Sequence, residues 1–214
     1  MHLNPYGEDA VALAVDLANA PPVTVDDLVR RCLNAGVVIT TPATEGDLRA
    51  VGTLIERWRA IAEVHDEQDR AALLNRLTMD AATTHPQLTD HAGTGWHLHY
   101  RRDGLPLPEL LHALISVGTA LHLAGRGMTR LGRCALPECT NLFADTSRTG
   151  RQRYCSTRCS NRHAVRRHRT RRGTDPQFTS WPECPLDGER PAAHLASGGG
   201  LEGESARRQP AAGD

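Results

Sequence analysis

The 214-residue sequence contains no lysine, so all 25 of its basic side chains are arginines. Aromatic residues make up only 4% of the chain, and we therefore expect a core built from leucine, valine, alanine and isoleucine. No segment approaches the ~18 consecutive apolar residues of a membrane-spanning helix, and the first residues lack the basic start and apolar block of a secretory signal. These absences predict a cytoplasmic protein that does not associate with membranes.

Motifs that mark common catalytic sites are also missing. The sequence has no P-loop, no GxGxxG after a strand, no GxSxG and no HExxH. His97 and His99 stand two apart on a predicted strand, but two ligands without a third are more typical of a surface face than of a metal site. Glu109, His112 and His122 border an apolar helix, where such residues are common at the edge of a core. We expect a protein that is not an enzyme.

The net charge of zero hides a separation of charge along the chain. Residues 1–125 contain 9 arginines and 16 acidic residues, a net charge of −7. Residues 126–172 contain 13 arginines and 2 acidic residues, a net charge of +11, whereas residues 173–214 carry −4. A short, strongly basic segment of this kind favours a polyanionic partner, although it could also dock onto the acidic part of its own chain.

Most of the chain before this basic segment is predicted to be helical. Amphipathic or apolar segments with capping residues predict helices over 8–20, 24–36, 44–64 and 66–82. Alternation over 95–101 predicts a strand, with Trp96, Leu98 and Tyr100 on one face. Pro108 then opens an apolar helix that ends at Gly125 and should lie at the centre of the core.

Four of the six cysteines stand in two short pairs, Cys134 with Cys139 and Cys155 with Cys159. In a reducing cytoplasm such pairs favour metal over disulfides, and four thiolates are a typical ligand set of one structural Zn²⁺ ion. His163 is an alternative ligand, because it lies one turn beyond the last cysteine.

The segments between the cysteines complete a small zinc finger at 131–172. We predict a loop with the first pair, a β-hairpin between Leu142 and Tyr154, and a helix from near Ser156 with the second pair, an arrangement like a treble clef. The expected fold class is thus mainly α, or α+β with a short hairpin: a helical domain at 1–130 followed by the finger. Residues 173–214, rich in glycine, proline and acids, are predicted to be disordered. Cys32 is expected in the helical core, and Cys184 as a free thiol in the tail.

The helix of the finger carries rows of arginines that fit phosphate. Guanidinium groups bind phosphate bidentately, and neutralised phosphates release counterions. We therefore predict nucleic-acid contacts from a set of polar residues in and before this helix: Arg148, Arg151, Arg153, Arg158, Asn161, Arg162, Arg166, Arg167, Arg169 and Arg171. The two aromatic residues of the finger, Phe143 and Tyr154, are expected in its core, which favours duplex DNA over stacked single strands. An RNA-binding protein and a zinc-stabilised protein-interaction module remain alternatives.

This segment resembles the CGNR zinc-finger family, whose pattern runs from a cysteine pair through Phe-x-Asp and Ser-Arg to Tyr-Cys-Ser and Cys-Gly-Asn-Arg. The matching positions are Cys134, Cys139, Phe143, Asp145, Ser147, Arg148, Tyr154, Cys155, Ser156, Cys159, Asn161 and Arg162. Ser160 replaces the signature glycine, and three residues instead of four separate the last two cysteines.

The resemblance implies a bacterial, stress-induced transcription regulator that binds DNA, with an ABATE domain before the finger. A homodimer would fit this role, since one finger offers few base contacts. A small-molecule effector in the helical domain is also compatible with it.

Overall fold

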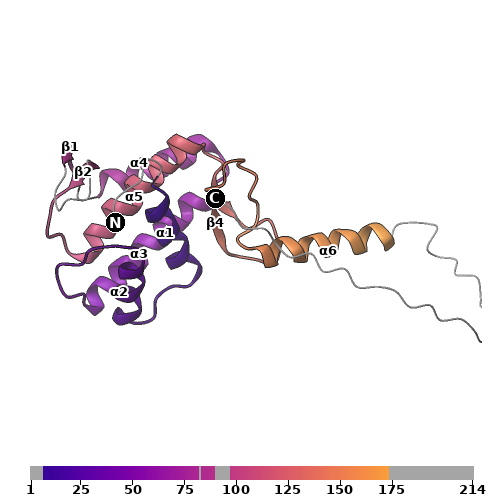
Figure 1. The fold of residues 1–214 in the computed structure, drawn as a ribbon, viewed down its shortest axis with the longest axis horizontal. Helices are drawn as coiled ribbons and strands as arrows, with labels where there is room; N and C mark the ends of the chain where they lie inside the picture. Colours follow the sequence, from indigo (N-terminus) through magenta and orange to yellow (C-terminus); the bar gives the residue numbers. More distant parts are fainter. Residues whose placement is uncertain (1–6, 82, 90–96, 174–214) are drawn as a thin grey trace, which may run out of the picture. The chain divides into compact units, whose positions relative to one another are not determined.

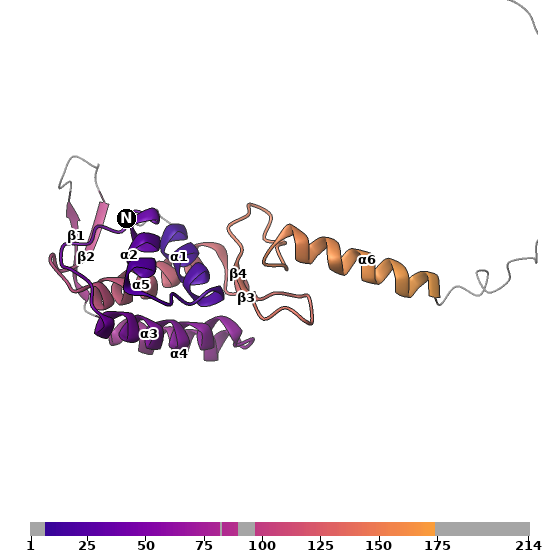
Figure 2. The ribbon, with the colours of Figure 1, turned by 90° about the horizontal axis from the view of Figure 1, so that it is seen from below.

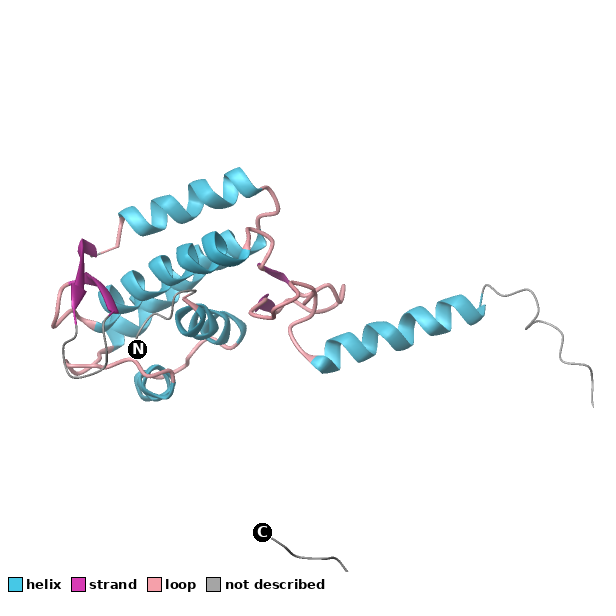
Figure 3. Ribbon diagram, turned by 45° about the horizontal axis from the view of Figure 1, so that its top comes forward, coloured by secondary structure: helices cyan, strands magenta, loops and turns pink. Residues whose placement is uncertain are grey.

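The computed structural model of the chain describes residues 7–81, 83–89 and 97–173 (Figure 1). Within these ranges the chain forms six helices and four short strands. They are α1 (Glu8–Asn19), α2 (Val25–Asn34), α3 (Glu45–Glu63), α4 (Glu67–Met79), β1 (Thr83–Thr89), β2 (His97–Arg101), α5 (Leu107–Arg126), β3 (Leu131–Arg133), β4 (Leu142–Ala144) and α6 (Thr157–Gly173). The predicted mainly α fold with small strands is confirmed (Figure 3).

Local capping residues fix where several of these helices begin. The Thr24 hydroxyl accepts a hydrogen bond from the Asp27 amide at 3.1 Å and starts α2. At the start of α3 the bonds are reciprocal, because the Thr44 hydroxyl accepts from the Asp47 amide and the Asp47 carboxylate accepts from the Thr44 amide at 2.8 Å. Such caps satisfy amides that the first helical turn leaves without a partner.

Helix α5 is the centre of the core, as its apolar sequence predicts. It packs against α1, α3 and α4 (Figure 2). A buried hydrogen bond of 2.9 Å from the Trp58 indole to the Thr119 hydroxyl joins α3 to α5. By length and mean hydropathy α5 could cross a membrane, so the expectation that no segment approaches such a span was too strict. However, 61% of its most apolar stretch is buried inside the fold, as in the core helix of a globular domain.

The start of α1 approaches α5 closely. Gly7, with φ of +63°, precedes α1, and a Cβ atom there would lie 2.1 Å from the carbonyl oxygen of Gly118. Only glycine fits this position, because any side chain would overlap the α5 backbone.

A two-stranded sheet connects α4 to α5. The predicted strand at 95–101 is present as β2, and Tyr100 is buried while Leu98, on the same predicted face, is 52% exposed. Trp96 lies outside the described residues. The partner strand β1 was not predicted, since Pro86 interrupts its sequence, and the pairing register shifts between Thr83 and Gln87.

The second sheet corrects the predicted hairpin. The expected strands between Leu142 and Tyr154 do not form one; β4 pairs instead with β3, which lies before the first cysteine. In the fully described segment 145–156 no strand is present. The physical reason is that the Asp145 carboxylate, and not a strand ladder, holds that segment, as described below.

Strands β3 and β4 are built into the core of the helical part. Leu131 and Leu142 belong to the same buried cluster as residues of α1, α3 and α5. The Arg70 guanidinium donates to the carbonyl of Val64 at the end of α3 and to that of Met128 just before β3. The described residues of the helical part and those of the finger belong to one compact unit, and the division at 130/131 stays a prediction. The predicted tail lies, apart from Gly173, outside the described residues, and so does Cys184.

Candidate metal centre

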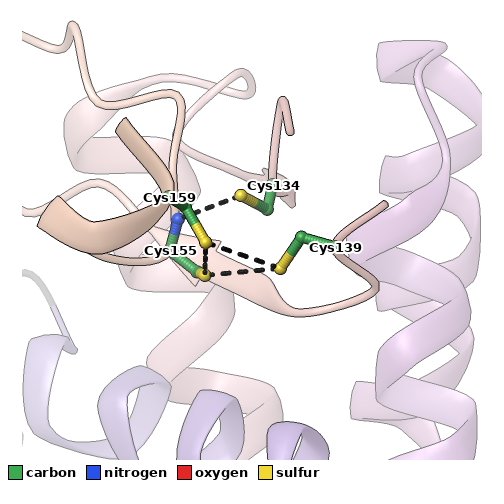
Figure 4. A group of neighbouring side chains, drawn as sticks. All are labelled: Cys134, Cys139, Cys155 and Cys159. Carbon is green, nitrogen blue, oxygen red and sulfur yellow. Dashed lines mark hydrogen bonds between the residues drawn. The ribbon is translucent and has the colours of Figure 1, made fainter. Parts of the chain in front are cut away.

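The four paired cysteines converge on one point (Figure 4). The sulfur of Cys155 lies 3.7 Å from that of Cys139 and 3.6 Å from that of Cys159, and the sulfurs of Cys159 and Cys139 are 3.8 Å apart. With Cys134 included, all four sulfurs lie within 4.8 Å of one another. A regular tetrahedron with Zn–S bonds of about 2.3 Å has S–S edges of about 3.8 Å. The sulfurs of Cys139, Cys155 and Cys159 therefore stand at the spacing that a zinc ion requires, and that of Cys134 lies within 4.8 Å of them.

A tight turn presents the first pair. Cys134 follows β3, and its amide donates to the carbonyl of Asn141 at 2.8 Å, which extends the β3–β4 pairing by one step. The Cys139 amide donates to the carbonyl of Leu136 at 2.9 Å and closes the turn. Because Leu136 is buried, this turn is anchored to the protein by its own side chain. The loop of the β3–β4 hairpin thus serves as the zinc knuckle.

The second pair lies at the start of α6. Ser156 precedes the helix, and its hydroxyl accepts a hydrogen bond from the Cys159 amide at 3.3 Å, as an N-cap does. The Cys155 amide points at the sulfur of Cys134, 3.5 Å away. A hydrogen bond of 2.7 Å from the Ala135 amide to the Arg153 carbonyl brings the two halves of the site together.

The chemistry of the four thiols favours a metal ion. All four are free, and the S–S distances of 3.6–3.8 Å exceed the ~2.05 Å of a disulfide. Burial, followed by the neighbouring thiols, raises the pKa of Cys155, whereas a hydrogen bond with Ser156 lowers that of Cys159, so the cluster does not hold several thiolates without a nearby positive charge. A divalent ion supplies that charge and binds the thiolates. Four sulfur ligands close the shell, as in a structural zinc site.

Asp145 organises the loop between the two cysteine pairs. Its buried carboxylate accepts hydrogen bonds from the Ser147 amide at 2.9 Å, the Ser147 hydroxyl at 2.6 Å and the Gln152 amide at 3.0 Å. The Arg130 guanidinium lies 3.3 Å away. Burial by itself would raise the pKa of the Asp145 carboxyl, but these hydrogen bonds and Arg130 outweigh burial and hold its pKa below the ordinary value.

Gly150 lets this loop close over Arg130. It has φ of +67°, and a Cβ atom there would lie 2.5 Å from the Arg130 guanidinium carbon. That guanidinium also donates to the Ser147 carbonyl at 2.7 Å, so it is held in place from two sides. Neither Gly150 nor Arg130 was a predicted site residue, although a glycine inside a turn-rich loop is a signal for positive φ.

His163 is not part of the metal cluster. Its Nδ1 atom lies 2.5 Å from the Tyr154 hydroxyl, and the two rings pack with centroids 5.5 Å apart. The alternative in which His163 replaces a cysteine ligand is therefore not supported. Tyr154, expected in the core of the finger, is half-buried and packs against His163.

The ten predicted nucleic-acid contacts are all exposed: Arg148, Arg151, Arg153, Arg158, Asn161, Arg162, Arg166, Arg167, Arg169 and Arg171. Those from Arg158 onward lie on α6, which starts inside the zinc site. Glu138, which was not predicted, faces two of them, with its carboxylate oxygens 3.5 Å from Arg162 Nε and 3.3 Å from Arg166 Nη1. The sequence offers one signal for it, because Glu138 and Asp145 are the only acids between 126 and 172.

The other candidate groups that the structure describes lie outside this cluster. Among the described residues, the metal-capable cluster that can be identified is the one of four cysteines. Cys32 is buried in the core as predicted, and burial raises the pKa of its thiol to about 11. His112 is used structurally, with Nε2 2.8 Å from the Leu77 carbonyl, and His122 is buried in α5.

Comparison with known proteins agrees with this geometry. Residues 130–172 match the family model of the CGNR zinc finger, a segment that contains all four cysteines and α6 up to Arg172. The resemblance seen in the sequence is thereby confirmed for the finger, whereas the ABATE domain stays a prediction. Among curated proteins, no relative matches the chain.

Proposed function

We propose that this chain, which carries a CGNR zinc finger at residues 130–172, binds duplex DNA through α6 and regulates transcription. The observation that carries the proposal is the exposure of all six predicted α6 arginines, in a helix whose first turn is locked to the cysteine cluster. The role is one of binding and not of catalysis, since four thiolates leave no open position on the metal.

The charge of α6 needs a counterpart. From Thr157 to Gly173 the helix contains no acidic residue, and several of its arginines stand three or four apart on one face. Like charges at this spacing destabilise a helix by a few tenths of a kcal/mol per pair. Phosphates along a duplex would turn this repulsion into attraction and release counterions.

Zinc, when bound by the four thiolates, supplies the cross-link that fixes α6 to the knuckle. Ser156 sets the first turn, and the pairing of Cys134 with Asn141 continues the hairpin that is packed into the core. The arginines after Cys159 are thus presented from a fixed base and not from a flexible tail, which lowers the entropy cost of binding.

The aromatic residues of the finger favour duplex DNA over single-stranded nucleic acid. Single strands are typically held by bases stacked on exposed rings. Within 130–172 the aromatic residues are Phe143 and Tyr154; Phe143 is buried, and the Tyr154 hydroxyl contacts His163. Backbone phosphates are the partner that remains for the basic helix.

Charge reversal on α6 tests the proposal. Zinc-loaded protein and its Arg162→Glu/Arg166→Glu variant are titrated into a labelled duplex, a matched RNA duplex and a single strand, with fluorescence anisotropy as the readout. We expect binding to the DNA duplex by the natural protein and a loss of at least about 100-fold in the variant. Tighter binding of either other probe would favour the alternative of an RNA-binding or single-strand-binding protein.

The control carries the same charge change on the helical part. Arg49→Glu/Arg76→Glu reverses two exposed arginines of α3 and α4, and should leave duplex affinity within about threefold. Equal losses in both variants would mean that net charge, and not α6, drives binding. No binding to any nucleic acid by the natural protein would leave a zinc-stabilised protein-interaction module as the explanation.

A full regulator needs more than one finger. One α6 spans few base pairs, so we propose that a dimer or a second contact region completes the recognition site. An effector bound by the helical part, and a cytoplasmic location, fit the same role.

A further inference from the structure

Glu138 is a negative charge in the middle of the surface proposed to bind DNA. Of the two acids between 126 and 172, Asp145 is buried and occupied by the loop, whereas the Glu138 side chain is 40% exposed. It stands in the zinc knuckle, directly before the ligand Cys139. A carboxylate at this place repels phosphates, so it weakens general binding to the DNA backbone.

The contacts of Glu138 leave hydrogen-bonding capacity on both sides. Its Oε1 atom faces Arg162 Nε at 3.5 Å, and its Oε2 atom faces Arg166 Nη1 at 3.3 Å. The contact to Arg162 runs through Nε, and a guanidinium group has two further nitrogens that can donate to another partner. Each carboxylate oxygen also keeps a second lone pair.

These groups line one groove of about 470 Å³ along α6. Its lining is mixed in character and consists of Glu138, Asn161, Arg162, Val165, Arg166, Arg169 and Thr170. Val165 is the exposed apolar residue in it. A surface that only neutralised phosphates would need neither a carboxylate, an amide nor an apolar side chain here, whereas the edges of base pairs present donors, acceptors and methyl groups.

We propose that Glu138 determines sequence specificity by accepting a hydrogen bond from the N4 amino group of cytosine, beside a guanine that Arg162 contacts. This inference rests on the proposed function, because it assigns a role within the same DNA complex. In the major groove cytosine presents a donor and guanine presents the O6 and N7 acceptors. An acidic and a basic side chain held together therefore match a G·C pair or two neighbouring ones.

The position of Glu138 suits such a role. It projects from a knuckle fixed by Cys139 and by the Cys139–Leu136 turn, while its arginine partners come from α6. A side chain that contacts DNA from a rigid backbone segment loses little entropy on binding. The same carboxylate lowers the affinity for DNA that offers no hydrogen-bond donor at this position. It therefore weakens binding to other sequences as well as favouring the preferred one.

A simpler role for Glu138 would be a strut that holds α6 to the knuckle. The two roles differ in what the isosteric Glu138→Gln variant changes. If the role is only structural, Glu138→Gln changes binding to every duplex equally and lowers thermal stability. If Glu138 determines specificity, Glu138→Gln changes the preferred bases and strengthens binding to unrelated DNA, because the repulsion between the carboxylate and the phosphates is removed.

The test is a selection of bound duplexes from a random pool by zinc-loaded natural protein, Glu138→Gln and Glu138→Ala, with Glu109→Gln on α5 as control. Zinc content and circular dichroism establish that each variant is folded. We expect the natural protein and the control to enrich a G·C-containing site. Both Glu138 variants should lose the preference for cytosine at one position by at least about fivefold and bind unrelated duplex more tightly.

The possible outcomes distinguish a failure of the Glu138 proposal from a failure of the proposed DNA binding. If the natural protein enriches a site and the Glu138 variants enrich the same site with equal preference, the role of Glu138 is refuted while DNA binding stands. If the natural protein enriches no duplex at all, DNA recognition fails first, and the inference fails with it.

Discussion

Asn19, at the C-terminus of α1, is joined to Leu142 of β4 by two hydrogen bonds, although 123 positions separate them in the sequence. The Asn19 side-chain amide donates to the Leu142 carbonyl at 2.9 Å, and the Leu142 amide donates to the Asn19 side-chain oxygen at 2.7 Å. The side chain thus replaces a neighbouring strand at the edge of the zinc hairpin. The helical part and the finger are connected through this pair.

Asn19→Ala should lower the free energy of unfolding by about 1–3 kcal/mol, because it leaves the Leu142 amide and carbonyl without partners. Thermal unfolding followed by circular dichroism measures the effect. The matched control is Asn34→Ala, an exposed asparagine at the end of α2. Equal melting temperatures for the two variants would show that the Asn19–Leu142 pair does not contribute to stability.

Cys155→Ser should abolish stoichiometric zinc, because Cys155 has two of the short sulfur contacts of the cluster. Elemental analysis of purified protein gives the zinc content. Cys32→Ala, in the helical core, should keep one zinc per chain. We expect the helical part to stay folded but with a lower melting temperature, since β3 and β4 contribute to its core. Unchanged zinc content would refute the four-thiolate site.

Gly150→Ala should cost more stability than Gly104→Ala, although both residues have positive φ, +67° and +70°. Alanine in this region of backbone space costs about 1–2 kcal/mol at either site. Only at Gly150 would the new Cβ also contact the Arg130 guanidinium, at 2.5 Å. Chemical denaturation of the two variants measures the difference. Equal losses would mean that Arg130 moves aside without cost.

The Asp145 carboxyl should add stability that depends on pH. Its pKa is lower in the folded protein than its ordinary value of about 3.9, so its stabilising effect is complete above that value. The effect is lost as the pH falls through the lower folded pKa. Asp145→Asn should therefore destabilise the protein at pH 7 and match the natural protein more closely below about pH 4. A gap that is independent of pH would contradict this role.

The features that the sequence predicted well depend on short-range patterns. The caps of α2 and α3, and the convergence of Cys155 with Cys159, follow from residues three or four apart. Pairings between distant segments were missed. The hairpin was placed after Leu142, because turn-rich sequence follows it, whereas the true partner strand β3 carries no strand signal of its own over three residues.

The same distinction applies within the site. The sequence shows how much charge the finger carries, but not that Glu138 faces Arg162 and Arg166 across 24 and 28 positions. That contact exists only because the sulfur cluster brings the knuckle against the first turns of α6. The sequence likewise does not show that Asp145 is buried and accepts hydrogen bonds from its loop, since an exposed aspartate would give the same pattern.

The dependence of duplex affinity on salt tests the central claim most directly. The dissociation constant of the zinc-loaded protein is measured on one duplex from 50 to 300 mM salt, and the logarithm of the affinity is plotted against the logarithm of the salt concentration. If four to six arginines of α6 each neutralise a phosphate, the slope should be about −3.5 to −5.5. A slope near zero, or no binding at the lowest salt, would contradict the claim that α6 presents a row of guanidinium groups to DNA.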